Sequence, residues 1–126
     1  MAIIDLIIRI KNGYMARREQ ISVPYSKFRE AVLAQLQALG YITRYEVAGD
    51  TKKNITITLT YEDGMPALTD VKIQSKPGRR IYTQYKEVKS VRGGLGYSIL
   101  STSQGILTGS EAKKKQIGGE LLFYIW

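Results

Sequence analysis

One stretch decides the fold of the C-terminal half of this chain: Ile99-Leu100-Ser101-Thr102-Ser103-Gln104-Gly105-Ile106-Leu107. Its two apolar pairs predict the strands of a hairpin, and Gly105 can supply the positive φ that the turn needs. Asn-Gly or Asp-Gly would reverse the chain more simply, so three adjacent hydroxyl residues suggest a further task. Hydroxyl groups donate and accept hydrogen bonds with little bulk. The tip is therefore suited to approach another surface closely.

The sequence around this hairpin predicts a mostly β lobe over residues 67–126. Short apolar stretches alternate there with glycine, proline and basic residues, which is typical of short strands joined by turns. We expect strands at Val71–Ile73, Ile81-Tyr82 and Glu120–Trp126, a turn at Lys76–Arg80, a loop at Gly93–Gly96 and a short helix over Ser110–Gln116.

Residues 1–66 predict an α/β lobe, because apolar residues recur first at helical and then at alternating spacing. A first helix over residues 3–11 should end at Asn12-Gly13, and a second should run from an N-cap at Ser26 to Gly40. The buried stripe of the second helix would be Phe28, Val32, Leu36 and Leu39. Strands are expected at Ile21–Val23, Tyr41–Val47 and 55–61, with Ile55, Ile57, Leu59 and Tyr61 on one face and a turn at Glu62-Asp63-Gly64.

Together the two halves predict an α+β fold. The N-terminal α/β lobe would contain helix, strand, helix and three strands, and it would pack on a mostly β C-terminal lobe with a short helix.

The composition excludes several kinds of catalytic and metal site. The 126 residues include no His and no Cys, so a thiolate nucleophile, an imidazole acid or base and a Cys/His zinc site are all excluded. Ser103 lacks the preceding glycine of a GxSxG motif and has no His to activate it. The glycines at 93–96 do not complete a GxGxxG motif, and Glu62-Asp63-Gly64 is a turn rather than a metal ligand set. We predict no enzyme activity, no cofactor and no metal.

The charge of the chain indicates a polyanionic partner. Its formal net charge is +8, and residues 66–126 carry 10 basic and 4 acidic residues, against 9 and 7 in residues 1–65. The span Val71–Lys86 has no acidic residue, and Tyr82 and Tyr85 are interleaved with its cations. Cations suit phosphates, and flat rings suit exposed bases. A solvated basic face is the alternative for this span, as it is for Lys113–Lys115.

No segment predicts targeting or membrane insertion. The Ile-rich start is interrupted by Asp5 and Arg9, and it lacks the basic region and the cleavage site of a signal peptide. No apolar run approaches the roughly 20 residues of a membrane span. Together with the absence of Cys, this favours an intracellular protein without a membrane partner.

Six short motifs follow one another along the chain: Arg9-Ile10-Lys11-Asn12, Val23-Pro24-Tyr25-Ser26-Lys27, Ser75-Lys76-Pro77-Gly78-Arg79-Arg80-Ile81-Tyr82, Gly94-Leu95-Gly96, Ser101-Thr102-Ser103-Gln104-Gly105-Ile106-Leu107-Thr108 and Ile117-Gly118-Gly119-Glu120. In this order and spacing they resemble the ribosomal small-subunit protein eight family of bacteria and organelles. The resemblance covers essentially the whole chain and is strongest over residues 75–126. Its most specific piece is the hydroxyl-tipped hairpin with the following Ala112-Lys113.

The resemblance implies a structural protein of the small ribosomal subunit that binds the central domain of small-subunit rRNA directly and helps to organise its assembly. It implies neighbouring small-subunit ribosomal proteins as partners, and a cytoplasmic or an organellar ribosome as the location. Some relatives also bind their own messenger RNA, which this sequence leaves open.

Most of the rRNA contact is expected from the C-terminal lobe, through Ser101, Thr102, Ser103, Gly105, Gly118, Gly119 and Glu120. The N-terminal lobe is expected to add Arg9, Lys11, Asn12, Ser26 and Lys27. The candidate set is completed by basic and aromatic residues of the C-terminal lobe, which are Lys76, Arg79, Arg80, Tyr82 and Lys113.

Three features depart from the family's pattern, of which the first is the absence of the Asp-Pro that usually precedes the first helix. Ile8 stands where Thr or Ser usually precedes the arginine, so a polar contact from that side chain is lost. Gly109 replaces the usual Asp after Thr108, so we expect Ser110 to cap the short helix, at a cost of roughly 1 kcal/mol or less.

Two other functions stay open on the sequence: a free-standing basic RNA- or DNA-binding module, and a small enzyme on a β scaffold.

Overall fold

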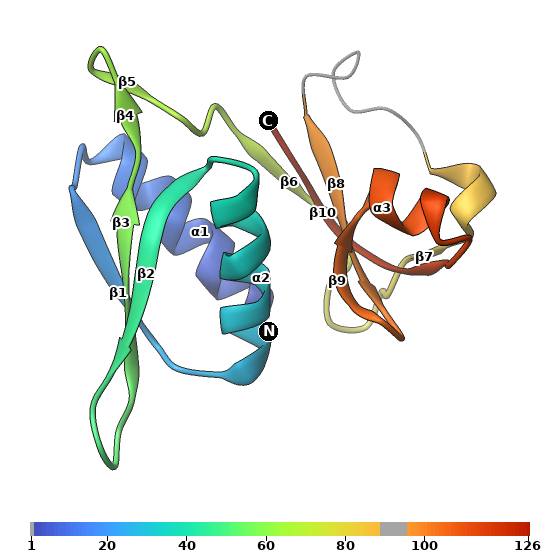
Figure 1. Ribbon diagram of the computed structural model, residues 1–126, viewed down its shortest axis with the longest axis horizontal. Helices are drawn as coiled ribbons and strands as arrows, with labels where there is room; N and C mark the ends of the chain where they lie inside the picture. The colour runs from blue at the N-terminus through green and yellow to red at the C-terminus, as the bar shows by residue number, and fades with distance from the viewer. Residues whose placement is uncertain (1, 89–95) are drawn as a thin grey trace. The chain divides into compact units, whose positions relative to one another are not determined.

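The computed structural model describes residues 2–88 and 96–126 and divides into two compact units, Ala2–Leu68 and Thr69–Trp126 (Figure 1). Each unit has its own antiparallel sheet, and helices are present in both. The predicted α+β fold is therefore confirmed. The predicted glycine loop lies outside the described residues at Gly93, Gly94 and Leu95.

The N-terminal unit packs two helices on a three-stranded antiparallel sheet with the strand order β1-β3-β2. Helix α1 contacts β1 and β3, and α2 contacts β2. A small two-stranded hairpin, β4-β5, follows the sheet and turns at Asp63 and Gly64, both with positive φ, as the sequence predicts. The elements are α1 (Ala2–Met15), β1 (Gln20–Pro24), α2 (Lys27–Ala38), β2 (Ile42–Ala48), β3 (Asn54–Leu59), β4 (Tyr61–Glu62) and β5 (Met65–Pro66).

Helix α1 is longer than the sequence predicts, and the expected end at Asn12-Gly13 is wrong. The helix continues to Met15, and Arg17 takes the positive φ that closes it. Gly13 is instead a point of close approach, because a Cβ there would lie 2.7 Å from Ile21 Cγ2 and 3.1 Å from Leu59 Cδ1. Glycine at this position lets the helix approach β1 and β3 closely. Ile3, Ile7 and Ile10 are buried on one face of the helix, whereas Ile8 is 44% exposed.

Helix α2 begins as predicted, with the Ser26 hydroxyl accepting a hydrogen bond from the Arg29 N–H at 3.0 Å. Its buried residues are Val32, Leu33 and Leu36, so Leu33 belongs to the stripe, whereas the predicted Phe28 and Leu39 are only half-buried. A left-handed Gly40 follows the C-cap, as expected.

Strand β3 shows the predicted alternation, with Ile55, Ile57 and Leu59 buried. Tyr61 does not extend it, because β3 ends at Leu59 and Tyr61 begins β4. The ring of Tyr61 packs edge-on against Tyr14, with 5.4 Å between centroids. The Tyr14 hydroxyl donates to the Tyr41 carbonyl and accepts from the Thr60 N–H at 2.9 Å, and burial raises the pKa of Tyr14. Tyr14 is therefore a core residue.

The C-terminal unit is built around strand β10, which pairs with β8 on one side and with both β6 and β7 on the other. The last strand of the sequence is therefore the centre of this sheet. The elements are β6 (Val71–Ile73), β7 (Tyr82–Thr83), the 3-10 helix η1 (Tyr85–Glu87), β8 (Tyr97–Thr102), β9 (Gly105–Thr108), α3 (Gly109–Lys114) and β10 (Gly119–Ile125).

Helix α3 is capped by Thr108, so the expected Ser110 cap is wrong. The Thr108 hydroxyl accepts from the Glu111 N–H at 3.2 Å, and Glu111 Oε1 accepts from the Thr108 N–H at 3.2 Å. This reciprocal capping box needs no acid at position 109. A side chain at Gly109 would collide with Ser98 Oγ and lie 2.6 Å from Val88 Cγ1. Glycine is therefore favoured at position 109 by packing.

Candidate nucleic-acid interface

The hairpin tip is a two-residue turn at Ser103 and Gln104, because Thr102 already pairs with Gly105. The Thr102 hydroxyl donates to the Gly105 carbonyl at 2.8 Å and accepts from the Gln104 N–H at 3.1 Å. Gly105 has φ 104 and open space where a Cβ would be. Ser103 is exposed, and its hydroxyl makes no hydrogen bond to any described residue. Thr102 therefore builds the turn, and Ser103 is the hydroxyl that it presents.

Gly118 and Gly119 lie between the hairpin and β7 and allow both to approach. A Cβ on Gly119 would collide with the Ser101 carbonyl oxygen and lie 2.9 Å from Thr102 Cγ2. A Cβ on Gly118 would lie 2.6 Å from the Thr83 carbonyl oxygen. Because these neighbours are backbone atoms, a larger residue would separate the strands.

Glu120 lies in the middle of a row across the sheet. It pairs with Tyr82 on β7 and with Ser101 on β8, so the three side chains share one face. Its carboxylate Oε2 lies 3.2 Å from Arg80 Nη1, with the Glu120 side chain 15% exposed and the Arg80 side chain 47% exposed. Tyr82 is 72% exposed. The strand pairing and this ion pair thus bring together residues that are up to 40 positions apart.

We call this group the hairpin surface. It contains nine of the residues that the sequence selects as RNA-contacting candidates, drawn from both ends of the C-terminal lobe. They are Arg80, Tyr82, Ser101, Thr102, Ser103, Gly105, Gly118, Gly119 and Glu120.

Three basic candidates of the C-terminal unit lie outside the hairpin surface. Lys76 and Arg79 are exposed at the two ends of a turn in which their backbones exchange hydrogen bonds of 3.1 and 2.9 Å, which confirms the predicted turn. Lys113 is exposed on α3, which packs through Ala112 against Leu100 and Leu121. Those leucines face opposite to their neighbours Ser101 and Glu120. The structure therefore does not bring Lys113 to the hairpin surface.

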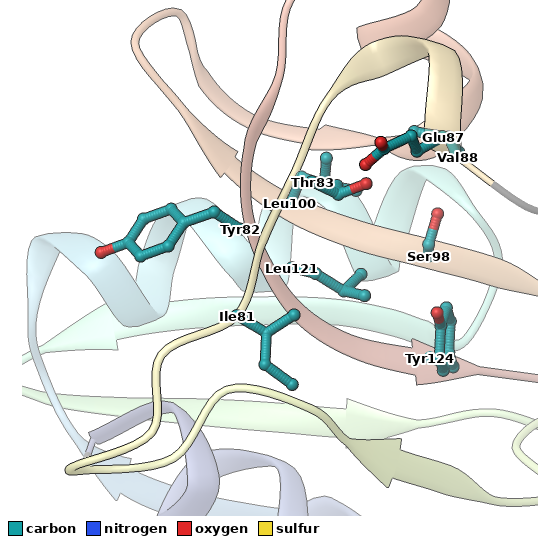
Figure 2. A pocket seen from close by; sticks show the side chains of 9 residues that line it. All are labelled: Ile81, Tyr82, Thr83, Glu87, Val88, Ser98, Leu100, Leu121 and Tyr124. Carbon is teal, nitrogen blue, oxygen red and sulfur yellow. The ribbon is translucent and has the colours of Figure 1, made fainter.

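A pocket of about 400 Å³ opens on the α3 side of the sheet (Figure 2). Ile81, Leu100 and Leu121 supply apolar walls, and the hydroxyl groups of Thr83 and Ser98 and the Glu87 carboxylate supply polar groups. The Tyr82 ring points away from the other lining side chains in Figure 2. Tyr82 is therefore available to the hairpin surface rather than to this pocket. The sequence does not predict the pocket.

The N-terminal unit has a groove between α1 and β1, with a volume of about 420 Å³. Two predicted residues, Arg9 and Asn12, line it together with Arg18, which the sequence analysis does not select. The adjacent pair Arg17-Arg18 after the first helix is the signal that could have identified it. Arg9 is already engaged: its Nε lies 3.2 Å from Asp5 Oδ2, and its Nη1 donates to the Ser22 carbonyl at 3.4 Å.

The other N-terminal candidates do not line this groove. Ser26 uses its hydroxyl as the N-cap of α2, Lys27 is exposed in the first turn, and Lys11 is half-buried on α1. Beside Ser26, the Tyr25 hydroxyl donates to Glu30 Oε1 at 3.3 Å. Desolvation and this carboxylate raise the pKa of Tyr25. The N-terminal candidates are thus divided between a groove and a helix start.

No group of three or more His, Cys, Asp or Glu side chains in residues 2–88 and 96–126 is placed to hold a metal ion. No helix in the same part of the chain is long and apolar enough to cross a membrane.

Comparison with known proteins agrees with the predicted resemblance. The family model described as ribosomal protein S8 matches residues 2–126. The chain belongs to the ribosomal protein S8 family. It is 48% identical over 125 residues to the small ribosomal subunit protein uS8 of Dictyoglomus thermophilum, covering 98% of this chain and 95% of that protein. The uS8 proteins of Chloroflexus aurantiacus and Mesomycoplasma hyopneumoniae (strain 7448) are 46% and 40% identical, over 97% and 98% of this chain and 94% and 95% of their own lengths.

Membership of the ribosomal protein S8 family places the chain among structural proteins of the ribosome rather than enzymes. The small-enzyme alternative is therefore set aside. The hairpin surface and the α1–β1 groove are therefore the two candidate surfaces for contact with a nucleic acid.

Proposed function

We propose that this chain is a structural component of the small ribosomal subunit that binds the central domain of small-subunit rRNA directly and helps to organise its assembly. Its other partners would be neighbouring small-subunit ribosomal proteins. The observation that carries the proposal is the hairpin surface, where strand pairing and an ion pair gather an exposed tyrosine, a serine and an arginine, and where the tip presents an exposed hydroxyl.

This surface suits RNA for three physical reasons. The Ser103 hydroxyl has room for a ribose 2′-OH or a phosphate oxygen, because the open space at Gly105 adds no bulk beside it. The Tyr82 ring offers a flat face to an unstacked base. Arg79, Arg80 and Lys76 supply cations for the phosphate backbone. We assign recognition to the hydroxyl tip and general affinity to Lys76 and Arg79.

The N-terminal unit would add a second, weaker contact. Arg18 and Asn12 line a groove that can accept a phosphate, while Arg9 is held by Asp5 and the Ser22 carbonyl. Lys11, Ser26 and Lys27 would contribute at the edges of the same unit. This contact would add to affinity more than to selectivity.

A binding titration tests the proposal. The pure protein is titrated with a fragment of the rRNA central domain and with an RNA duplex of unrelated sequence, at several salt concentrations. We expect tighter binding to the fragment and, if roughly five phosphates are neutralised, a slope of log K against log salt near −4. Equal affinity for both RNAs would contradict direct, specific binding, and a slope near zero would contradict the role of the cations.

A sedimentation experiment tests the free-standing alternative. A component of the subunit should co-sediment with small ribosomal subunits at a fixed stoichiometry after a high-salt wash. A protein that remains at the top of the gradient would instead act as an independent basic RNA-binding module.

A further inference from the structure

The hairpin surface contains one acidic residue, Glu120, although its proposed partner is a polyanion. An isolated carboxylate there would repel phosphates, and an acid normally weakens such an interface. The side chain is largely shielded from solvent, at 15% exposure, yet it lies in the same cross-strand row as Tyr82 and Ser101. The position of Glu120 therefore needs a physical explanation.

Its contact with Arg80 supplies the explanation. Glu120 Oε2 lies 3.2 Å from Arg80 Nη1, and this is the only polar contact of the Arg80 guanidinium within the described residues. A guanidinium has five N–H donors in a fixed plane, so most of them stay available after one ion pair. The Arg80 side chain is 47% exposed, so the available donors can reach an external acceptor.

We propose that Glu120 is a positioning residue that acts on RNA through Arg80, a proposal that rests on the function proposed above. The carboxylate holds the guanidinium at the cross-strand row that contains Glu120, and the remaining N–H groups bind an RNA phosphate in a fixed geometry. Holding a long side chain in its bound conformation reduces the entropy that binding costs. The pairing also neutralises the charge of Glu120 toward the RNA.

Arg79 is the matched comparison, because it is a neighbouring exposed arginine without an acidic partner in the described part of the chain. Its guanidinium is not held, so it should neutralise phosphates of any RNA. Arg80 should contribute mainly to the RNA whose phosphate lies at the position that Glu120 fixes. The two arginines thus differ in selectivity rather than in charge.

A double-mutant cycle tests the proposal with Glu120→Gln, Arg80→Gln and the double variant. The probes are the central-domain fragment and the unrelated duplex. In the wild-type background, Glu120→Gln should weaken binding to the fragment by about fivefold, the upper range for a partly exposed ion pair. It should leave binding to the duplex unchanged or tighter, since one acidic charge is removed. In the Arg80→Gln background, it should cause no further loss on the fragment.

Two further variants separate positioning from a merely structural effect. Arg80→Lys keeps the charge but loses the planar donors, so it should lose affinity for the fragment while retaining that for the duplex. Glu120→Gln combined with Arg79→Gln should show additive losses on the fragment. Thermal unfolding of each variant checks that the unit stays folded, and a loss that is equal on both RNAs would overturn positioning.

The remaining outcomes also decide the question. If Glu120→Gln weakens binding to the fragment equally in the Arg80→Gln background, Glu120 contacts RNA itself. If Glu120→Gln does not change binding in the wild-type background, the ion pair has no role in binding. Either result overturns the proposal. If the wild-type protein does not prefer the fragment over the duplex, the proposed function fails before any variant is compared. The two failures are therefore distinguishable.

Discussion

The two surfaces expected to contact RNA are built in different ways. In the C-terminal unit, strand pairing places Tyr82, Glu120 and Ser101 in one row, and the Ser103 hydroxyl is free within the described residues. In the N-terminal unit, the groove lies between a helix and a strand, and Arg9 is already bound to Asp5 and the Ser22 carbonyl. The sheet thus fixes several side chains relative to one another. In the groove, by contrast, one of the cations already contacts polar groups of the protein itself.

We infer from this difference that the two surfaces contribute differently to the selectivity and the affinity of RNA binding. Specific recognition needs donors and acceptors held at fixed positions, which the hairpin surface has. Phosphate neutralisation needs only charge near the backbone, which both surfaces have. We therefore expect changes in the hairpin surface to alter selectivity, and changes in the groove to alter affinity for all RNAs alike.

The largest effect is expected from glycine substitutions that probe how each surface is packed. Gly119→Ala should lower the free energy of unfolding by about 1–3 kcal/mol, because the new Cβ meets the Ser101 backbone, which cannot move without disturbing β8. Gly13→Ala meets only side-chain atoms of Ile21 and Leu59, and it gains about 0.8–1 kcal/mol of helix propensity. Urea unfolding of both variants measures the difference, and equal losses would contradict it.

The next largest effect is expected at the hairpin tip. Ser103→Leu should weaken binding to the central-domain fragment by more than about 1 kcal/mol, because it removes a hydrogen bond and blocks close approach. Folding should change little, since Ser103 is exposed. Ser110→Leu, at an exposed serine on α3, is the matched control and should leave binding unchanged. Similar affinities for the two variants would move the contact away from the tip.

A smaller effect is expected from Arg79→Ala, which tests the general electrostatic contribution. Affinity for the fragment and for the unrelated duplex should fall by the same factor, and the salt slope should decrease in magnitude by about 0.7–0.9. Titrations at several salt concentrations measure both quantities. A loss confined to one RNA would mean that Arg79 reads structure rather than neutralising phosphate.

The smallest effect is expected from the groove of the N-terminal unit. Arg18→Gln should weaken binding to both RNAs by about 0.5 kcal/mol or less, as is typical of an exposed charge. The same titrations apply. A selective loss on the central-domain fragment would show that the groove recognises RNA specifically, and it would remove the distinction between the two surfaces.

Much of the fold could be predicted from local sequence signals. The hydroxyl-tipped hairpin, the Ser26 cap and the turn at Glu62–Gly64 depend on residues close in sequence, and the structure confirms all three. The hairpin turn is shorter than predicted, because Ser101 and Thr102 belong to β8 and only Ser103 and Gln104 form the tip. The errors have tertiary causes. Gly13 follows the pattern of a helix end but packs against β1 and β3. Gly109 removes the acid that usually follows Thr108, but Thr108 and Glu111 cap the helix without it.

The candidate site could be predicted only as a set of residues. The spacing of motifs selects Glu120, but it does not reveal that Glu120 pairs with Tyr82 and Ser101 or that its carboxylate meets Arg80. Those relations arise from strands that are distant in sequence. For the same reason, the sequence could not show that Lys113 faces away from the hairpin surface or that Arg18 lines a groove.

Footprinting of the pure protein on naked small-subunit rRNA tests the central claim most directly, with Ser103→Leu and Arg18→Gln compared with the wild-type protein. We predict one compact protected region in the central domain, which Ser103→Leu shifts selectively to a protein concentration at least about fivefold higher and Arg18→Gln leaves in place at a slightly higher protein concentration. Protection that is spread over the rRNA without preference, or a central-domain footprint that survives Ser103→Leu unchanged, would contradict the assignment of specific binding to the hairpin surface.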